Sequence, residues 1–573
     1  MFNPRIFCVF FLLSLTSILS AQVTVRTSQE LKEILMQDRE VGTIILDGDL
    51  FSIEQCKVYA GGKFRSARNR HPIIIGRHKL IKKSDGRSAE VGYWKAKIRD
   101  FKGNYYVLDQ NNQDIPISCE VNGVRNIRVK YENIEKLNDT TFEIRIKFDE
   151  DFNIVLNRDA EFYKTCSLKM SFWFICFNVV NLHSDSQYLY GQVESKYFYD
   201  ILCNYYKSDS YVIFQNSPFC PKGKVYVDGD YYIHVPNEIT AVRFCNSLGI
   251  MKLRGDRDFT VEGLTFKCSE NPIEFKSGTH KHINKCTFQS CGKSVDANRG
   301  VNNSDCYSSV TNCSFFNTYS NQCLNFYGCD NVTIKGNVFR HTGTVDKGNS
   351  VIAVAGDSFD VSDNDIQDFS FIAIGIGNTR GYGVIKIVGD IHNNYVDNYK
   401  QYGHPETQMI DGGGIYVFTH NDSTVVRDNI ICNIGFDHGS ERGIYLDDGA
   451  YNAHILRNLV YNIYPGDKAI FARLVDSCPR NGINNEFIGN ICVGKCVMYG
   501  HKGSYGRKAI IKDNYIDGEL DTDPHFNEAF EGNKTIQTIV RPNGKLYIDK
   551  EVKINKKQYS REIRKRINNK RKI

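Results

Sequence analysis

One column of residues recurs through the second half of the chain and constrains the fold more than any other feature. Each member lies two positions before an apolar residue, and neighbouring members are 24 to 35 positions apart. The column consists of Cys286, Cys313, Asn337, Asn364, Asn394, Asn429, Asn458, Asn490 and Asn514. Self-similarity with a period of about 20 to 50 residues indicates a repeat architecture, in which each unit stacks on the next.

The residues between the members of this column favour β-strands. Runs such as VTIKGNVF and STVVRDNII alternate between apolar and polar residues, and Gly, Asn and Asp separate them. Coils of this length with stacked asparagines predict an all-β chain that forms a right-handed parallel β-helix, and the LxxLxL pattern of leucine-rich repeats is absent. Asparagine suits the column because it tolerates the left-handed turn conformation. Its amide is also expected to bond to the same amide in the next coil.

The first 21 residues have the pattern of a secretory signal peptide. Arg5 supplies a positive charge, an apolar run follows, and the small residues Ser20 and Ala21 end the segment. This pattern predicts export, so we expect a secreted or periplasmic protein. No later segment holds the run of about 18 apolar residues that a membrane-spanning helix needs, so no membrane span is expected.

The remaining chain divides into four segments. Residues 22–88 contain a short amphipathic helix, TSQELKEIL, which we expect to cap the β-helix, followed by its first coils. Residues 89–245 lose the period and are rich in aromatic β-type runs, which predicts an inserted antiparallel β-sandwich or barrel. Residues 246–535 carry the main β-helix, and residues 536–573 form a basic tail.

The positive charge is concentrated in that tail. The whole chain has a formal net charge of +6, whereas residues 551–573 hold ten Lys or Arg and two Glu, a net of +8. The rest of the chain is therefore about −2, which argues against nucleic acid as a partner of the body. The 19 cysteines lack the spacing of a zinc site. We interpret most of them as small buried residues, with a few disulfides allowed by export.

The segment IDGGGIYVFTHNDSTVVRDNIICNIGFDHGSERGIYLDDGA carries the candidate chemistry. Gly-Ile-Tyr occurs in it twice, with Asp411 before the first copy and with Asp447 and Asp448 after the second. Two carboxylates across a groove are the minimum equipment for cutting a glycosidic bond. The intervals of the repeat are longest here, and insertions in a solenoid form loops on one face, often the binding face. We therefore expect the groove over these coils.

The alternation of side chains in a strand predicts which residues face this groove. We take Ile415 and Ile444 to point into the core. The outward positions of these strands and of the next coil, aligned through Ile470, are then Tyr416, Phe418, Tyr445, Asp447, Phe471 and Arg473. Arg473 is thus expected beside Asp447, one coil away. The outward facing of Asp447 favours it over Asp448 as a catalytic residue.

The two acids can be given different roles. An arginine beside Asp447 would lower the pKa of its carboxyl and keep it ionised as base or nucleophile. Asp411, in a more apolar setting, would stay protonated as the general acid, and the two roles could be exchanged. Asp411 and Asp448 also fit the simpler interpretation of Asp-Gly turns.

Further candidates for substrate contact flank the same strands. Tyr416, Tyr445 and Phe418 could stack on sugar rings, although a packed aromatic ladder on the outer face is the alternative. The remaining candidates besides Arg473 lie in the loops before the two Gly-Ile-Tyr strands: His438, Glu441, His404 and Glu406, of which Glu406 is a third candidate acid.

The arrangement resembles the β-helix glycoside hydrolases, especially glycoside hydrolase family 141 and more distantly family 120. The matching stretches are KGKVYVDGDYYIHVP, FTVEGLTF, DGGGIY and GIYLDDG followed by NLVYN. The resemblance implies cleavage of fucosidic or xylosidic bonds in plant polysaccharides by a pair of aspartates. Those aspartates correspond to Asp411 and to Asp447 or Asp448, while the sugar specificity does not carry over.

Three functions remain open from the sequence. We expect a glycoside hydrolase that acts on an oligo- or polysaccharide without a cofactor or metal. A polysaccharide lyase is the alternative, and it would need an arginine or lysine base, such as Arg473 or Arg442, usually with calcium held by the carboxylates. The third is a glycan-binding protein without catalysis, because one scaffold can host many functions.

Overall fold

The computed structural model describes residues 22–76, 78–82, 92–95, 106–111, 126–128, 134–147, 160, 163, 166–172, 175–195, 210–216, 226–228, 232–235, 241–245, 249–254, 257–275, 280–297, 307–346, 348–377, 386–399, 411–418, 423–435, 441–447, 450–464, 468–474, 484–500, 509–522, 527–535, 539–540 and 546–547. The predicted signal peptide and residues 548–573 of the predicted basic tail lie outside these ranges.

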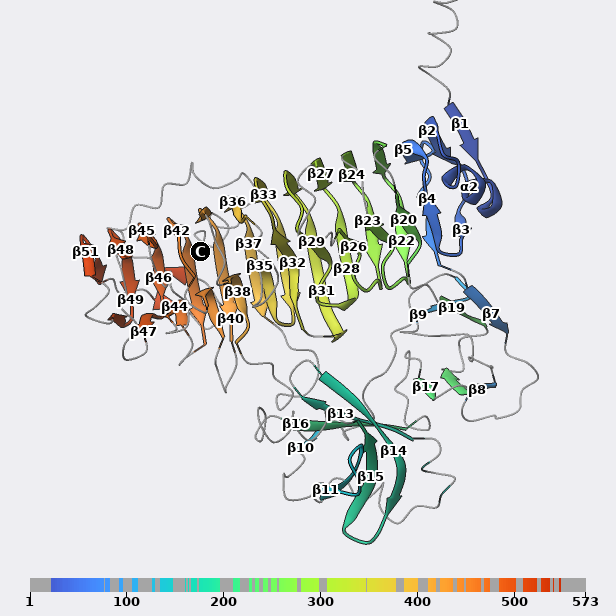
Figure 1. Ribbon diagram of the computed structural model, residues 1–573, viewed down its shortest axis with the longest axis horizontal. Coiled ribbons are helices and arrows are strands. Elements are labelled where there is room, and N and C mark those ends of the chain that lie inside the picture. The colour runs from blue at the N-terminus through green and yellow to red at the C-terminus, as the bar shows by residue number, and fades with distance from the viewer. Residues whose placement is uncertain are drawn as a thin grey trace, which may run out of the picture.

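Three long parallel sheets of 14, 12 and 13 strands wind into a right-handed β-helix (Figure 1). Each coil adds one strand to each sheet, so the strand order in every sheet follows the order of the chain. One coil, for example, runs through β36 (Val388–His392), β37 (Tyr395–Tyr399) and β38 (Gly413–Val417) before β39 (Ser423–Arg427) begins the next. The fold class predicted from the asparagine column is confirmed.

The 12-stranded sheet carries the two Gly-Ile-Tyr motifs. Its strands, in order, are β4 (Cys56–Val58), β20 (Met251–Leu253), β23 (Ile273–Phe275), β26 (Val295–Asp296), β29 (Leu324–Tyr327), β32 (Ser350–Ala355), β35 (Ile372–Ile376), β38, β41 (Arg442–Leu446), β44 (Lys468–Leu474), β47 (Lys495–Gly500) and β50 (Leu520–Thr522).

A short helix closes the N-terminal end of the core. The helix α2 (Ser28–Leu35) follows β1 (Gln22–Val25), and Thr27 caps it with a reciprocal pair of bonds to Glu30. The Thr27 hydroxyl accepts from the Glu30 amide at 3.2 Å, and the Glu30 carboxylate accepts from the Thr27 amide at 3.2 Å. Leu31 and Leu35 are fully buried in the core of the β-helix, so the amphipathic segment TSQELKEIL covers its first coil.

The β-helix is interrupted after β6 (Ile73–Ile75) and resumes at β20 in the register of the first coils. Although the interruption separates β20 from β4 in the chain, the two strands pair in parallel, with Met251 opposite Cys56. The first strand after β6, β7 (His78–Lys82), pairs with the last strand before β20, β19 (Ala241–Cys245), and His78 lies opposite Cys245. The two ends of the interruption therefore meet at one antiparallel ladder, earlier than the predicted boundary at residue 89.

The interruption itself is antiparallel where the structure describes it. Its largest sheet contains seven strands, in the order β10 (Asn126–Arg128), β16 (Ser210–Asn216), β13 (Cys166–Phe172), β14 (Ile175–Ser184), β15 (Tyr188–Glu194), β12 (Thr141–Lys147) and β11 (Ile134–Lys136). Two three-stranded sheets accompany it, β17-β18-β8 and β7-β19-β9, formed by β8 (Gly92–Lys95), β9 (Tyr106–Asp109), β17 (Tyr226–Asp228), β18 (Tyr232–Val235) and the ladder of β7 and β19.

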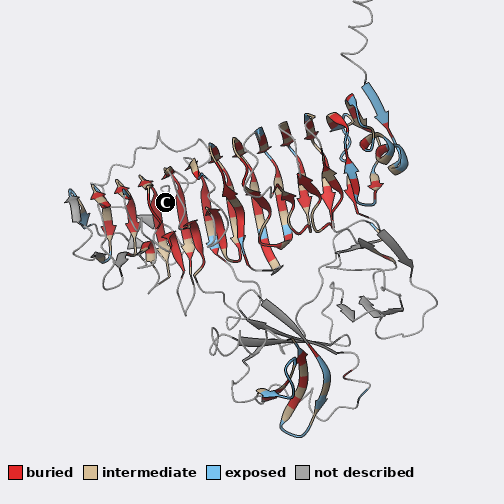
Figure 2. Ribbon diagram, in the orientation of Figure 1, coloured by how far each residue is buried: buried red, intermediate tan, exposed pale blue. Residues whose placement is uncertain are grey.

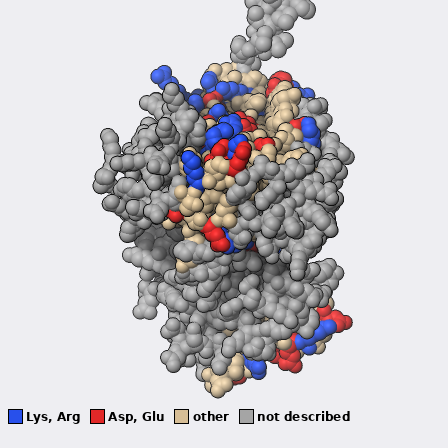
Figure 3. All heavy atoms as spheres, turned by 90° about the vertical axis from the view of Figure 1, so that its left-hand side faces the viewer, with Lys and Arg blue, Asp and Glu red and all other residues tan. Residues whose placement is uncertain are grey.

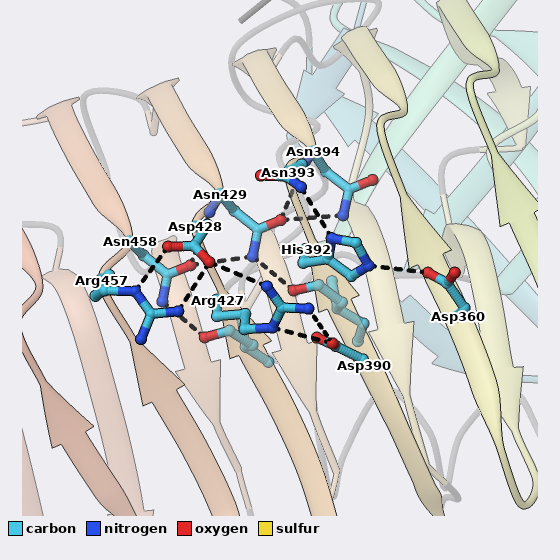
Figure 4. Close-up of polar contacts among 12 residues, drawn as sticks. Asp360, Asp390, His392, Asn393, Asn394, Arg427, Asp428, Asn429, Arg457 and Asn458 are labelled. Carbon is cyan, nitrogen blue, oxygen red and sulfur yellow. Dashed lines mark hydrogen bonds and ion pairs between the residues drawn. The ribbon is translucent and has the colours of Figure 1, made fainter. Parts of the chain in front are cut away.

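The asparagines of the column form a continuous buried ladder, part of which Figure 4 shows. Each amide nitrogen donates to the amide oxygen of the next rung, as in the bond from Asn394 to Asn429 at 3.0 Å and the bond from Asn429 to Asn458 at 3.0 Å. Each rung also accepts from the backbone N–H of the preceding rung and donates to a backbone carbonyl. The predicted stacking of amides is confirmed, and it continues to Asn533.

The expectation that the column itself takes the left-handed conformation is wrong. The residue before each rung has a positive φ instead, for example Asp363 (56°), Asn393 (56°) and Asp428 (55°). The rung asparagines are therefore selected for their buried hydrogen bonds. The preceding position makes the left-handed turn, and Arg457 (53°) fills it before Asn458.

Charged side chains tie the coils together beside this ladder (Figure 4). Arg427 lies between Asp390, 3.0 Å from its Nε, and Asp428, 3.2 Å from its Nη1. Arg457 adds two further bonds to Asp428, whose side chain is almost completely buried. Because Asp428 also makes the left-handed turn, one residue serves both the backbone and the contact between coils.

The interior is lined by apolar side chains from all three sheets, and Figure 2 shows the buried strands along the whole β-helix. Ten cysteines, among them Cys286, Cys313 and Cys492, are buried with free thiols, as expected of small core residues. Among the described residues, the model contains no helix long and apolar enough to cross a membrane.

A stack of phenylalanine rings in the core allows a prediction of how much one buried ring contributes to the free energy of unfolding. Phe266, Phe288, Phe315 and Phe339 are buried, with successive ring centroids 5.2, 4.9 and 4.5 Å apart. Replacing Phe315 with alanine should lower the free energy of unfolding by about 3 to 5 kcal/mol, because it opens a cavity between two rings. Chemical denaturation followed by circular dichroism measures this loss. The same change at exposed Tyr307 should cost less than about 0.5 kcal/mol, and equal losses would contradict the role of the stack.

Candidate functional site

The site lies on the outward face of the 12-stranded sheet, over β38, β41 and β44. The register places Tyr416, Tyr445 and Phe471 opposite one another, while Ile415, Ile444 and Ile470 line the core beneath. The three aromatic rings form their own cluster on the outer side, together with Phe418. The facing predicted from alternation is therefore confirmed for these residues.

The aromatic rings pack against one another instead of standing free. The Tyr416 and Tyr445 centroids are 4.6 Å apart in an edge-to-face arrangement, and Phe471 follows at 5.1 Å. All three side chains are buried. The structure thus shows the packed aromatic ladder, and this burial speaks against Tyr416 and Tyr445 as open platforms for a sugar ring.

Three coils converge on the carboxylate of Asp447. The Tyr416 hydroxyl donates to its Oδ2, the Tyr445 hydroxyl donates to its Oδ1 at 2.7 Å, and Arg473 Nη1 lies 3.8 Å from the same Oδ1. Arg473 is beside Asp447, as predicted. Asp447 is 9% exposed, so most of its contact with water has been replaced by these donors.

The two tyrosines are held in their donor form. Burial raises the pKa of Tyr416 well above its ordinary value, and the negative charge of Asp447 raises it further. The pKa of Tyr445 is raised for the same reasons. Both hydroxyls therefore keep their protons and can donate to the carboxylate at any pH at which the protein works.

Asp411 does not have the apolar setting that was expected for it. Its Oδ1 lies 3.3 Å from Nη2 of Arg442, and its side chain is 34% exposed. It adopts a left-handed backbone (φ 65°) just before the glycines, so the turn interpretation is also correct. The cation beside it removes the original reason for choosing Asp411 as the protonated acid.

Arg442 links the two acids. Its guanidinium carbon lies 4.9 Å from the centroid of Tyr445 and 4.9 Å from that of Phe471, so it covers the aromatic ladder. Its Nη2 reaches Asp411 while Tyr445, beneath it, reaches Asp447. Lys468, opposite Arg442 in the next coil, approaches the Phe471 ring at 5.2 Å. The sequence makes Arg442 a candidate for substrate contact, from the loop before the second Gly-Ile-Tyr strand, and a candidate base for the lyase, whereas no sequence pattern singles out Lys468.

The glycine of the second Gly-Ile-Tyr motif has a packing role. A β-carbon on Gly443 would clash with Cγ1 of Val460 and with the backbone oxygen of Ala469. Gly443 and Ile444 therefore both face inward, and the strand loses its alternation at this point. Arg442, one residue earlier, is consequently turned to the outer side. The repeated tripeptide is explained by this close approach between coils.

The other predicted residues divide into two groups. Glu441 is 2% exposed, and this burial argues against direct contact with a substrate. Phe418 is half-buried and stacks on Tyr416 at 4.4 Å. The residues outside the described ranges are Asp448, His438, His404 and Glu406. Among the described residues, no three His, Cys, Asp or Glu side chains come together in a way that could hold a metal ion.

Side chains of both charges are mixed at the C-terminal end of the β-helix. Figure 3 views the C-terminal end of the β-helix, and basic and acidic side chains lie next to one another there. Lys495 pairs with Glu519 at 2.8 Å in this region, and Lys512 pairs with Glu531. Exposed pairs of this kind contribute little stability, typically below about 1 kcal/mol each.

Comparison with known proteins identifies the fold. No protein-family model and no curated protein matches the chain. Among solved structures it is similar to a glycoside hydrolase, with a TM-score of 0.51 and 11% identity over 85% of this chain and 92% of that one. It also aligns with the catalytic domain of a GH87 α-1,3-glucanase in complex with tetrasaccharides (TM-score 0.27, 10% identity, 80% of this chain and 98% of that one).

A PL6 family alginate lyase aligns as well, with a TM-score of 0.23 and 14% identity over 54% of this chain and 51% of that one. At such identities the likeness establishes the fold alone, and the two weaker alignments carry no argument.

Proposed function

We propose that the protein is a secreted glycoside hydrolase whose reaction takes place over β38, β41 and β44. The observation that carries this proposal is the carboxylate of Asp447, which accepts from two tyrosine hydroxyls and lies beside Arg473. A packed face needs no carboxylate there, and burying one is costly unless it is fully bonded. Three coils thus supply donors to one acid, as expected of a preorganised catalytic group.

The second carboxylate of the proposal is Asp411. Asp447 is level with Phe418 in the register, and Asp411 lies two positions before Gly413. The five steps from Gly413 to Phe418 alone span about 16 Å at about 3.3 Å per residue. Retaining enzymes hold their carboxylates about 5 Å apart, and inverting enzymes hold them further apart, at about 6.5 to 9.5 Å, to leave room for a water molecule. The backbones are too widely spaced for the retaining arrangement, so the proposal takes the inverting form, with a water molecule between sugar and base.

In this mechanism each residue has a defined task. Asp447, which accepts from two hydroxyls, takes the proton of the attacking water. Asp411 has the task of giving a proton to the leaving oxygen. The motif resemblance to family 141 points to the same pair and suggests a fucosidic or xylosidic bond. The similar solved structure, a glycoside hydrolase, is an example of this fold in a protein of the proposed reaction class.

The deciding experiment is incubation of the full exported chain with a panel of aryl-glycosides and plant oligosaccharides. Release of reducing sugar without an unsaturated, ultraviolet-absorbing product supports the hydrolase. Release of the unsaturated product would replace it with the polysaccharide lyase. Binding of glycans without any release would indicate a binding protein. Proton magnetic resonance of the first product should show the inverted anomer.

The hydroxyl of Tyr445 gives a finer prediction. Tyr445→Phe keeps the ring of the aromatic ladder and removes one donor from Asp447, so kcat should fall about 10- to 100-fold with little change in KM. Phe471→Leu, which alters the same ladder without touching Asp447, should lower kcat much less. An equal loss of kcat in both variants would assign the effect to packing.

A further inference from the structure

The guanidinium of Arg442 is incompletely bonded although it is buried. The residue is 6% exposed, and only Nη2 has a partner, the carboxylate of Asp411 at 3.3 Å. Within the described part of the chain, Nε and Nη1 have no hydrogen-bond partner. Native proteins rarely leave buried charged donors unbonded, and each such group calls for an explanation.

The position of Arg442 indicates where the missing acceptor comes from. Its plane rests on Tyr445 and Phe471, which fix it against the sheet. Asp411, beside it, is about a third exposed, and Lys468, opposite it on the next coil, is half-buried. Nε and Nη1 of Arg442 thus lie beside the partly exposed Asp411 and next to a second cation, Lys468. They are on the same face of the sheet as Asp447.

We propose that Arg442 and Lys468 form a subsite for the negatively charged substituent of an acidic glycan, a uronate carboxylate or a sulfate ester. This inference rests on the proposed function, and it specifies the substrate class of that site. An anion is favoured over a neutral hydroxyl because bonds from a guanidinium to an anion are about twice as strong as neutral ones. The planar donors of arginine also match the geometry of carboxylate and sulfate oxygens.

The test is binding of three oligosaccharide probes to the full chain by calorimetry: oligogalacturonate, a sulfated galactan oligosaccharide and a neutral xylo-oligosaccharide. One acidic probe should bind at least about tenfold more tightly than the neutral one, and its affinity should fall as salt is added. Whichever acidic probe is preferred identifies the anion as carboxylate or sulfate. Equal affinity for all three probes would overturn the subsite.

Variants identify the residues responsible. Arg442→Gln should weaken the acidic probe about 10- to 100-fold and leave the neutral probe unchanged, and Arg442→Lys should recover part of the loss. Lys468→Gln should weaken it by a smaller factor, and it tests the same subsite if Arg442→Gln does not fold. Lys495→Gln is the matched control, because Lys495 follows Lys468 in the same row and lies one coil further from Arg442. Equal losses for acidic and neutral probes in Arg442→Gln and Lys468→Gln would refute the proposal.

The outcomes also separate this inference from the reaction itself. Arg442-dependent binding of an acidic glycan that is never cleaved would retain the subsite and reject the hydrolase. Cleavage of neutral glycans, with no preference for acidic ones, would retain the hydrolase and reject the subsite.

Discussion

Replacing Asp447 with asparagine should reduce glycan cleavage at least about a thousandfold in kcat/KM while leaving the fold intact. The amide keeps the size of the side chain, so one of the two tyrosines that now donate to separate oxygens can still donate to the amide oxygen, and the other hydroxyl can accept from the amide NH2. It cannot accept the proton of the attacking water, and the reaction loses its base. Release of reducing sugar from the best substrate of the panel measures the effect, and circular dichroism monitors the fold.

Two matched variants make this prediction specific. Asp411→Asn should also reduce the rate, but substrates with a good aryl leaving group should lose much less, because they need little help from an acid. Asp397→Asn is the control, since Asp397 is a partly buried carboxylate that accepts from Tyr395 in the neighbouring 13-stranded sheet. Full activity in Asp447→Asn would move the catalytic assignment to Asp448 or Glu406.

The second large effect concerns the asparagine ladder. Asn429→Ala should lower the free energy of unfolding by about 3 to 5 kcal/mol, as expected when several buried polar groups lose their partners together. Asn429 accepts from the backbone and amide nitrogens of Asn394 and donates to Ile391 and Asn458. The alanine removes all four of these buried bonds, while Asn458 keeps the bond from the backbone N–H of residue 429 and Asn394 keeps its bond to Val361. Chemical denaturation monitored by circular dichroism gives the change.

The last rung of the ladder provides the comparison. Asn533 makes the same kind of bonds to Asn514 and Ile511, but it is only partly buried. Water can replace the hydrogen bonds that Asn533→Ala removes, so the free energy of unfolding should fall by less than about 1.5 kcal/mol. If the two substitutions cost the same, burial of the amides is not the source of the ladder's stability.

The fold could be predicted from the sequence because the ladder appears there as a column of asparagines at regular intervals. A buried amide that bonds to its own copy in the next coil requires asparagine at nearly every rung, so a single column reveals the stacking. The left-handed turn could not be located in the same way. Gly336, Asp363, Asn393 and Arg457 all occupy that position, and only the backbone dihedrals identify it.

The candidate site could be predicted in part. Alternation from Ile444 placed Tyr445 and Asp447 outward, and the next coil placed Arg473 beside Asp447, as the structure shows. The same alternation turns Arg442 inward, because it assumes that Gly443 faces outward. Gly443 packs against Val460 instead, so two successive residues face the core. The burial of Tyr416 and Tyr445 could not be predicted from the sequence either, since it depends on how rings from neighbouring coils pack.

The ladder of β7 and β19 has a consequence for how the chain assembles. Met251 and its partner Cys56 are 195 positions apart in the chain, 251 minus 56. Contacts at such a separation form slowly during folding, whereas the other parallel pairs of the β-helix join successive coils. The entropy of closing so long a loop exceeds that of closing a 24-residue coil by only about 2 kcal/mol, because it grows with the logarithm of length. Since the antiparallel ladder of β7 and β19 joins both ends of the interruption, formation of this one ladder accounts for the entropy of closing the loop. The two parts of the molecule can then fold separately, and the interruption could be exchanged for another segment without altering the register of the coils on either side.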